Sequence, residues 1–412
     1  MKVILVVGDG MADRPVEELG GKTPLQAART PSMDTVARFG ICGMMDVISP
    51  GIPPGSDTAH LAIFGYDPCQ TYEGRGVFEA LGAGLEVNEG DISFRCNFAT
   101  VDDDMIVLDR RAGRIGDEAG ELARALDGFG PESYPDVRVV VKHTVEHRCA
   151  MILRGEGLSR VVSDSDPHEE NRPVLAVKPL DQTPEAAKTS TVLNELTERF
   201  HKVMDAHPIN DQRRAEGLPA ANILLFRGAA TRPKLQPIYD VYGVRGLAIA
   251  VGALYRGVAR CVGMDIIDVG GATGTYETDT VAKARAVVEN LRDYDMVFVH
   301  VKGTDNAGHD GDVEKKVMMI EKIDGLLGYL LGHTDPSNTV IAVTADHTTP
   351  VSVRKHAGDP VPVAITGPGV RADAVQRYSE VDCALGGLGR IRGVDLMPII
   401  MNLVGRTEMF GA

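Results

Sequence analysis

No stretch of the 412 residues approaches the roughly 20 consecutive apolar residues that a membrane-spanning helix requires. The apolar run near the start, residues 3–7, stops at Asp9, so we expect a strand there and no signal peptide. The chain also lacks internal repeats and low-complexity tails. These absences indicate a globular protein of the cytoplasm that has no membrane partner.

Paired cysteines are missing as well. The six cysteines, Cys42, Cys69, Cys96, Cys149, Cys261 and Cys383, are scattered without the spacing of a zinc-binding or redox motif, which fits buried thiols in a reducing compartment. Positive charge is in deficit, because 43 lysines and arginines stand against 58 aspartates and glutamates, for a net charge of −15. That balance excludes a general binder of nucleic acid or of anionic membranes. An anionic substrate would therefore need local arginines or metal ions.

The length and the order of the predicted elements indicate an α/β core with an insertion. A chain of 412 residues allows two domains, or one core with a large insertion. Strands and helices alternate up to about Gly84 and again from about Leu235, whereas paired strands with a few helices lie between. We therefore predict an α/β core of residues 1–85 and 236–412 and a smaller α+β domain of residues 86–235.

Hydrophobic periodicity places the expected elements. In the core, strands are expected at residues 3–7, 41–48, 296–301 and 340–343, and helices at residues 24–39 (with Pro31 placed to split it), 56–64, 247–255, 281–291 and after His309. In the insertion, strands are expected at residues 92–101, 105–108, 137–142, 148–153 and 222–226, and helices at residues 116–126 and 185–206.

Acidic and imidazole side chains follow three of the core strands. The occurrences are Asp9 after residues 3–7, Asp305 and His309 after residues 296–301, and Asp346 and His347 after residues 340–343. In an open parallel sheet, the carboxyl ends of the strands lie at one edge, where ligands bind. Asp9, Asp305 and Asp346 are therefore expected to meet, although they are far apart in the sequence.

Carboxylate oxygens and imidazole nitrogens together suit a divalent metal such as zinc or manganese. Asp305 and His309 are four residues apart and can face one centre from a helical turn or a tight loop. His356, in a polar stretch beyond the third strand, is the natural last imidazole ligand. The alternatives are a polar turn for any single Asp-His pair and a solvent-exposed histidine for His356, but the threefold recurrence favours a metal site.

A rigid loop rich in proline and glycine, residues 49–55, leads into the expected helix that starts at Ser56. A hydroxyl at a helix N-terminus meets free backbone N–H groups and the positive end of the helix dipole, which suits phosphate. Ser56 alone could simply cap the helix, whereas beside two metals it becomes an activated nucleophile. The glycine-rich residues 270–274 lack the lysine and hydroxyl residue of a phosphate loop, and we expect a mobile loop there.

Together these motifs resemble the alkaline phosphatase superfamily and, more narrowly, the archaeal cofactor-independent phosphoglycerate mutases. The resemblance is carried by residues 8–10, 55–60, 305–310 and 345–347 and His356, and it extends into the insertion at residues 98–100 and 109–114. It implies a mostly parallel sheet with helices on both faces and an inserted cap domain. It further implies one metal held by Asp9, Ser56, Asp346 and His347, and another held by Asp305, His309 and His356.

The resemblance implies the interconversion of 2-phosphoglycerate and 3-phosphoglycerate in glycolysis and gluconeogenesis, through a phosphoserine at Ser56. Two divalent ions (Mn, Zn, Co or Mg) would serve, without 2,3-bisphosphoglycerate. Arginine forks suit the substrate carboxylate, and the candidates, about half of which we expect to fail, are Arg95, Arg110, Arg111, Arg114, Arg227 and Arg232. Candidates for proton transfer are His143, His147 and Asp164, whereas His60 is better placed to support the Ser56 loop.

Three rival functions remain open from the sequence. A metallophosphatase or phosphodiesterase would use the same core without arginines in a cap domain. A phosphotransferase of the wider family would act on a sugar or an amino-alcohol such as homoserine. A carbohydrate-binding or metal-storage module would have no use for the nucleophilicity of Ser56. The identity of the metal is also open, as is the question of a homo-oligomer.

Overall fold

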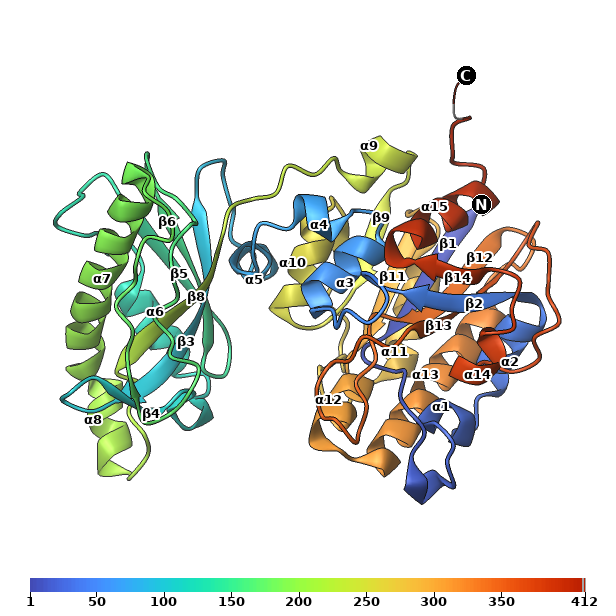
Figure 1. Ribbon diagram of the computed structural model, residues 1–412, viewed down its shortest axis with the longest axis horizontal. Helices are drawn as coiled ribbons and strands as arrows, with labels where there is room; N and C mark the ends of the chain where they lie inside the picture. Colours follow the sequence, from blue (N-terminus) through green and yellow to red (C-terminus); the bar gives the residue numbers. More distant parts are fainter. Residues whose placement is uncertain (410, 412) are drawn as a thin grey trace. The chain divides into compact units, whose positions relative to one another are not determined.

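The computed structural model describes residues 1–409 and 411. The chain divides into two compact units, a core unit of Met1–Tyr72 and Leu235–Ala412 and an inserted unit of Glu73–Lys234 (Figure 1). The predicted boundary between residues 85 and 86 lies beyond this division, because helix α5 (Gly76–Gly82) packs on the sheet of the inserted unit. Within the described residues, no helix is both long and apolar enough to cross a membrane.

The core unit is built on an eight-stranded sheet with the order β10-β9-β11-β1-β12-β13-β2-β14. Its strands are β1 (Lys2–Gly8), β2 (Gly40–Asp46), β9 (Gly246–Ile249), β10 (Asp265–Ile266), β11 (Met296–Val301), β12 (Thr339–Ala345), β13 (Val361–Thr366) and β14 (Gly389–Arg392). All neighbours are parallel except β13, which runs antiparallel to β12 and β2. The prediction of a mostly parallel sheet is confirmed.

Strand β1 lies in the middle of this sheet, with Val3 paired to Met296 of β11 on one side and to Val340 of β12 on the other. Its residues Val3 to Val7 are at most 1% exposed. A parallel strand that is covered on both faces reads as a continuous apolar run, which explains why these three strands were recognisable in the sequence.

Helices cover the sheet in two groups (Figure 1). Helix α3 (Ser56–Ile63) packs with α10 (Ala253–Cys261) and α15 (Gly393–Leu403). Helix α13 (Val313–His333) packs with α1 (Pro24–Ala27), α2 (Pro31–Arg38), α11 (Thr280–Asn290) and α12 (Gly303–Asp310). The remaining short helices are η1 (Glu17–Leu19), α4 (Pro68–Thr71), α9 (Ile238–Tyr242) and α14 (Glu380–Cys383). The expected break at Pro31 is present, since α1 and α2 are separate helices.

The helix predicted at residues 247–255 is wrong. Residues Gly246–Ile249 form strand β9, which pairs with β11 and β10, and α10 begins only at Ala253. Gly252, with a φ of +95°, lies just before the helix. Periodicity alone does not distinguish a short buried strand from a helical segment. Here the segment is a strand that pairs with β11.

The inserted unit has an antiparallel six-stranded sheet, and its α+β character was predicted correctly. The strands are β3 (Ile92–Val101), β4 (Ile106–Asp109), β5 (Arg138–Val145), β6 (Arg148–Arg154), β7 (Arg172–Pro173) and β8 (Ile223–Ala230). Besides α5, its helices are η2 (Ala112–Arg114), α6 (Ala119–Leu126), α7 (Pro184–Asp205) and α8 (Pro208–Ala215). Phe94, Cys96 and Phe98 of β3 enter the hydrophobic core formed with α6 and α7, so alternate residues such as Arg95 face the other way.

Candidate metal centre

The carboxyl ends of β1, β11 and β12 bring acidic and imidazole groups together. Asp9 directly follows β1, Asp305 lies in the first turn of α12 after β11, and His347 follows β12. One ligand atom from each of these three residues lies within 4.8 Å of the other two, and each side chain is at most 1% exposed. We call them the buried group.

A second set, Asp305, His309 and His356, also has ligand atoms within 4.8 Å of one another, and we call it the outer group. Asp305 Oδ1 is 3.3 Å from His309 Nε2 and 3.5 Å from His356 Nε2. His309 lies one helical turn after Asp305 on α12, as the spacing suggested. Asp305 therefore belongs to both groups, whereas the resemblance placed it only with His309 and His356.

The two imidazoles of the outer group are oriented by main-chain carbonyls. His309 Nδ1 is 2.9 Å from the carbonyl oxygen of Arg354, and His356 Nδ1 is 2.8 Å from that of Pro54. A carbonyl can only accept, so each Nδ1 carries a proton, and Nε2 is the nitrogen left to bind a metal ion. Metal-binding histidines are held in this same way.

Asp346 lies next to the buried group. Its Oδ1 accepts a bond from Gly10 N–H at 2.9 Å, and its Oδ2 lies 3.3 Å from His347 Nε2. Asp346 Oδ2 and Asp9 Oδ1 are buried and accept no hydrogen bond from any described residue. Burial and the neighbouring Asp9 raise the pKa of Asp346 to about 7. Buried carboxylate oxygens without donors, beside open imidazole nitrogens, fit a divalent cation.

Ser56 faces this arrangement. Its side chain is 6% exposed, and its Oγ lies 3.3 Å from His347 Nε2. Gly55 is the N-cap of α3, with no side-chain capping bond, so the structure does not support a capping role for Ser56. His60 Nδ1 lies 2.6 Å from the carbonyl oxygen of Ser56, one turn earlier. This contact matches the supporting role expected for His60.

Sequence reasoning missed several groups that hold the carboxylates. Lys302 Nζ lies 3.1 Å from Asp9 Oδ2 and 2.5 Å from Asp305 Oδ2, and His300 Nε2 lies 3.0 Å from Asp9 Oδ2. Thr349 Oγ1 donates to Asp305 Oδ1 at 2.8 Å. Lys302 and His300 are close to the recognised motif in sequence, which is the signal that could have found them. Thr349 had none, because two adjacent threonines looked like a turn.

Close packing around Thr349 explains a glycine in helix α12. A Cβ on Gly308 would lie 2.4 Å from the carbonyl oxygen of Thr349. We expect Gly308→Ala to lower the free energy of unfolding by about 1–3 kcal/mol, although alanine normally favours a helix. Gly325, inside α13, has nothing within 4 Å of such a Cβ, so Gly325→Ala should instead stabilise by up to about 1 kcal/mol. Urea unfolding of both variants checks the opposite signs.

In the inserted unit, three of the six predicted arginines lie close to the carboxylate of Asp166 or are neighbours of each other. Arg110 makes two bonds to Asp166, at 3.0 and 2.7 Å, and Arg227 Nη1 lies 3.2 Å from the same carboxylate. Arg95 on β3 is the direct cross-strand neighbour of Arg227 on β8. Asp164 is adjacent, because its Oδ1 accepts a bond from Gly228 N–H at 2.9 Å.

The other predicted residues of this unit are placed differently. Arg232 donates to the carbonyl oxygen of Val87 at 3.2 Å, and His143 Nε2 lies 2.7 Å from the carbonyl oxygen of Glu146. The positive charges of Arg111 and Arg114 influence the pKa of His147, which is 4% exposed. Burial, followed by the charges of Arg148 and these arginines, lowers the pKa of His147 from 6.5 to about 4.

His147 should make stability depend on pH. Between pH 6.5 and about 4 the unfolded chain binds a proton at this residue and the folded chain does not, so the free energy of unfolding falls as the pH falls. We expect His147→Gln to remove about 1–3 kcal/mol of this fall. Urea unfolding followed by circular dichroism at several pH values measures it. An unchanged slope in the variant would contradict the buried, neutral imidazole.

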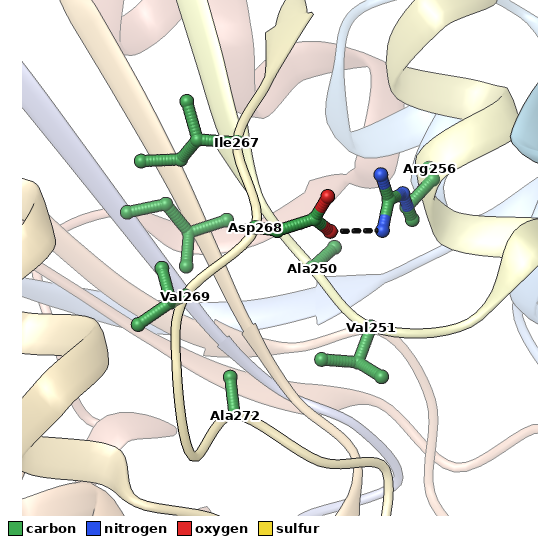
Figure 2. Close-up of a pocket in the computed structure, with 8 residues that line it drawn as sticks. Ala250, Val251, Arg256, Ile267, Asp268, Val269 and Ala272 are labelled. Carbon is green, nitrogen blue, oxygen red and sulfur yellow. Dashed lines mark hydrogen bonds and ion pairs between the residues drawn. The ribbon is translucent and has the colours of Figure 1, made fainter. Parts of the chain in front are cut away.

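A cavity of about 260 Å³ opens at the carboxyl ends of β9 and β10 (Figure 2). It is lined by Ile249, Ala250, Val251, Arg256, Ile267, Asp268, Val269 and Ala272. In Figure 2 its polar side chains, Arg256 and Asp268, point at each other, with Nη1 and Oδ1 2.5 Å apart. None of the catalytic, substrate-binding or metal-binding residues predicted from the sequence lines this cavity. The candidate site is therefore the cluster at the ends of the three central strands.

Comparisons with known proteins agree on one family. The family described as 2,3-bisphosphoglycerate-independent phosphoglycerate mutase matches residues 37–210. A curated protein of that name from Ignicoccus hospitalis is 53% identical over 100% of this chain and 99% of its own length. One from Methanocaldococcus jannaschii, with the suffix 1, is 48% identical over 100% and 99% of the two chains.

Two solved structures extend the likeness to the fold. A protein from Pyrococcus horikoshii superposes with a TM-score of 0.87 at 42% identity, over 100% of this chain and 99% of its own. A cofactor-independent phosphoglycerate mutase from Thermoplasma acidophilum superposes with a TM-score of 0.74 at 35% identity, over 98% and 100% of the two chains.

Proposed function

The chain belongs to the 2,3-bisphosphoglycerate-independent phosphoglycerate mutases, and from that premise we propose that Ser56 carries the phosphoryl group during catalysis. The enzyme interconverts 2-phosphoglycerate and 3-phosphoglycerate without 2,3-bisphosphoglycerate. The observation that carries the proposal is the position of the Ser56 hydroxyl, 3.3 Å from His347 Nε2 and beside carboxylate oxygens that lack donors. The alternative functions, a phosphatase or a phosphotransferase, are not favoured by the comparisons.

We assign two divalent ions to the two groups described above. Asp9, Asp346, His347 and Ser56 would hold one ion, and His309 and His356 the other, while Asp305 belongs to both groups of residues. When bound, the ions would supply a lowered pKa at the serine hydroxyl and charge neutralisation at the phosphate. Manganese is the first ion to test, because the oxygen-rich ligand set suits it.

Ser56 Oγ attacks the phosphorus of 3-phosphoglycerate, and the bond between phosphorus and the glycerate oxygen breaks. The serine hydroxyl releases its proton to solvent, and the proton-transfer group proposed below protonates the departing glycerate oxygen. The 2-hydroxyl of glycerate then gives its proton to that same group and attacks the phosphoserine, the bond between phosphorus and Ser56 Oγ breaks, and the serine oxygen takes up a proton from solvent. Lys302, whose ammonium group bridges Asp9 and Asp305, keeps these carboxylates in place throughout. The Ser56 side chain is 6% exposed, and this burial limits the access of water that would otherwise hydrolyse the phosphoserine.

We propose that the inserted unit binds the carboxylate of glycerate through Arg95, Arg110 and Arg227. Arg110 and Arg227 share the single carboxylate of Asp166, and Arg95 Nε lies 3.4 Å from Glu79 Oε1, so guanidinium groups of neighbouring strands are gathered in one place. Arg232 is a weaker candidate because its guanidinium donates to the carbonyl oxygen of Val87, and Arg111 and Arg114 are weaker because they are exposed. For proton transfer we favour Asp164, next to Arg227, over His143 and over His147, whose pKa of about 4 leaves it neutral at pH 7.

The proposed setting is glycolysis and gluconeogenesis in the cytoplasm. The test is an assay of the purified chain, stripped of metal and reconstituted with Mn²⁺, for 2-phosphoglycerate formation from 3-phosphoglycerate without 2,3-bisphosphoglycerate. Inorganic phosphate is measured in the same reaction. Isomerisation that far exceeds phosphate release supports the mutase. Phosphate release at the same rate as isomerisation would instead show a phosphatase.

A further inference from the structure

Thr349 lies between the two ligand groups, and we propose that its hydroxyl positions both of them for metal binding. Thr349 Oγ1 donates to Asp305 Oδ1 at 2.8 Å and lies 3.0 Å from His347 Nδ1. Asp305 belongs to both groups and His347 to the buried one, so a single hydroxyl contacts a ligand of each. This inference rests on the metal-dependent function proposed above.

The hydrogen-bond partners around His347 determine which of its ring nitrogens carries the proton. A hydroxyl has one proton, and because the carboxylate of Asp305 can only accept, Thr349 gives that proton to Asp305. His347 Nδ1 must therefore donate to Thr349 Oγ1, which leaves the lone pair on Nε2. That Nε2 lies 3.3 Å from Asp9 Oδ1 and 3.3 Å from Asp346 Oδ2, where a cation would be held. Thr349 thus selects the binding tautomer of His347.

Thr349 is itself held from several sides. Its carbonyl oxygen accepts a bond at 2.7 Å from Lys316 Nζ, a buried ammonium that also contacts Asp13 Oδ2 at 2.6 Å. Its N–H donates to the carbonyl oxygen of Ala12 at 3.3 Å. A Cβ on Gly10, which has a φ of +58°, would lie 2.4 Å from Thr349 Oγ1. Gly10 therefore leaves room for the hydroxyl of Thr349, while Lys316 and Ala12 hold its main chain.

The test removes the hydroxyl without changing the volume of the side chain. Thr349→Val should bind Mn²⁺ at least tenfold more weakly at both sites, because the His347 tautomer is then no longer fixed and Asp305 Oδ1 loses the hydroxyl that donates to it. Thr349→Ser restores the hydroxyl and should bind within threefold of the wild type. Thr348→Val is the matched control, since it removes a neighbouring buried hydroxyl that donates to the carbonyl oxygen of Asp359.

Isothermal titration of the metal-free chains with Mn²⁺ gives the affinities and the number of ions bound, without an activity measurement. The inference is overturned if Thr349→Val binds Mn²⁺ as the wild type does, or if Thr349→Ser is as weak as Thr349→Val, since packing would then be responsible. A wild type that binds no Mn²⁺ is a different result, because it overturns the metal-dependent function itself.

Discussion

Ser56→Ala is expected to lower the turnover of phosphoglycerate isomerisation by about 10⁴-fold or more, because it removes the only proposed acceptor of the phosphoryl group. The alanine keeps the helix start, since Gly55 and not Ser56 occupies the N-cap of α3. Metal content should stay close to that of the wild type, because Asp9, Asp346 and His347 remain. Turnover is measured with Mn²⁺ present, and incorporation of phosphate from labelled substrate into the protein should disappear.

A matched control separates this effect from a general loss of structure. Ser190→Ala also removes a buried helical hydroxyl, one that donates to the carbonyl oxygen of Ala187 in α7 of the inserted unit. It should leave turnover within a few-fold of the wild type. If Ser56→Ala retained wild-type turnover, another residue would carry the phosphoryl group and the assignment would be wrong.

Asp305→Asn is expected to lower turnover by about 10³-fold or more and to weaken the binding of both ions. Asp305 is the one residue common to the buried and outer groups, so loss of its charge affects both. An amide is a poorer metal ligand than a carboxylate. In asparagine, a nitrogen would also replace one of the two carboxylate oxygens, which face Lys302 Nζ or the Nε2 atoms of His309 and His356. Metal content by elemental analysis and turnover should fall together.

Asp310 offers the control on the same helix. It is an exposed carboxylate at the end of α12 that accepts a bond from the hydroxyl of Tyr276 at 2.6 Å and belongs to neither group. Asp310→Asn changes the net charge by the same amount as Asp305→Asn and should bind two ions with near wild-type affinity. Equal metal loss in both variants would point to a charge effect of the whole surface rather than to ligation.

The meeting of Asp9, Asp305 and Asp346 was accessible from the sequence, because each follows an apolar run and parallel strands share one ligand-binding edge. Strand β9 was not accessible, since Leu247, Ala248 and Ile249 fit a helix as well as a buried strand. The role of Thr349 was not accessible either. It depends on the distance from Thr349 to Asp305, across the sheet edge between segments that are remote in sequence.

The arginines of the inserted unit show a second limit. Six candidates were equal in the sequence, because each was a plausible partner for a carboxylate. Cross-strand register made the difference: Arg95 and Arg227 are direct neighbours on β3 and β8, whereas Arg232 is bonded to a main-chain carbonyl. Antiparallel register over a separation of more than a hundred residues is set by tertiary packing, which the local pattern does not contain.

The central position of β1 has a consequence for biosynthesis. Both of its partners, β11 and β12, begin after residue 295, so the first strand to leave the ribosome has no neighbour in its sheet until most of the chain has been made. The inserted unit, complete by Lys234, can fold well before then. Throughout that interval the apolar segment from Val3 to Val7 has no strand partner in its sheet, so the core sheet is completed late in synthesis.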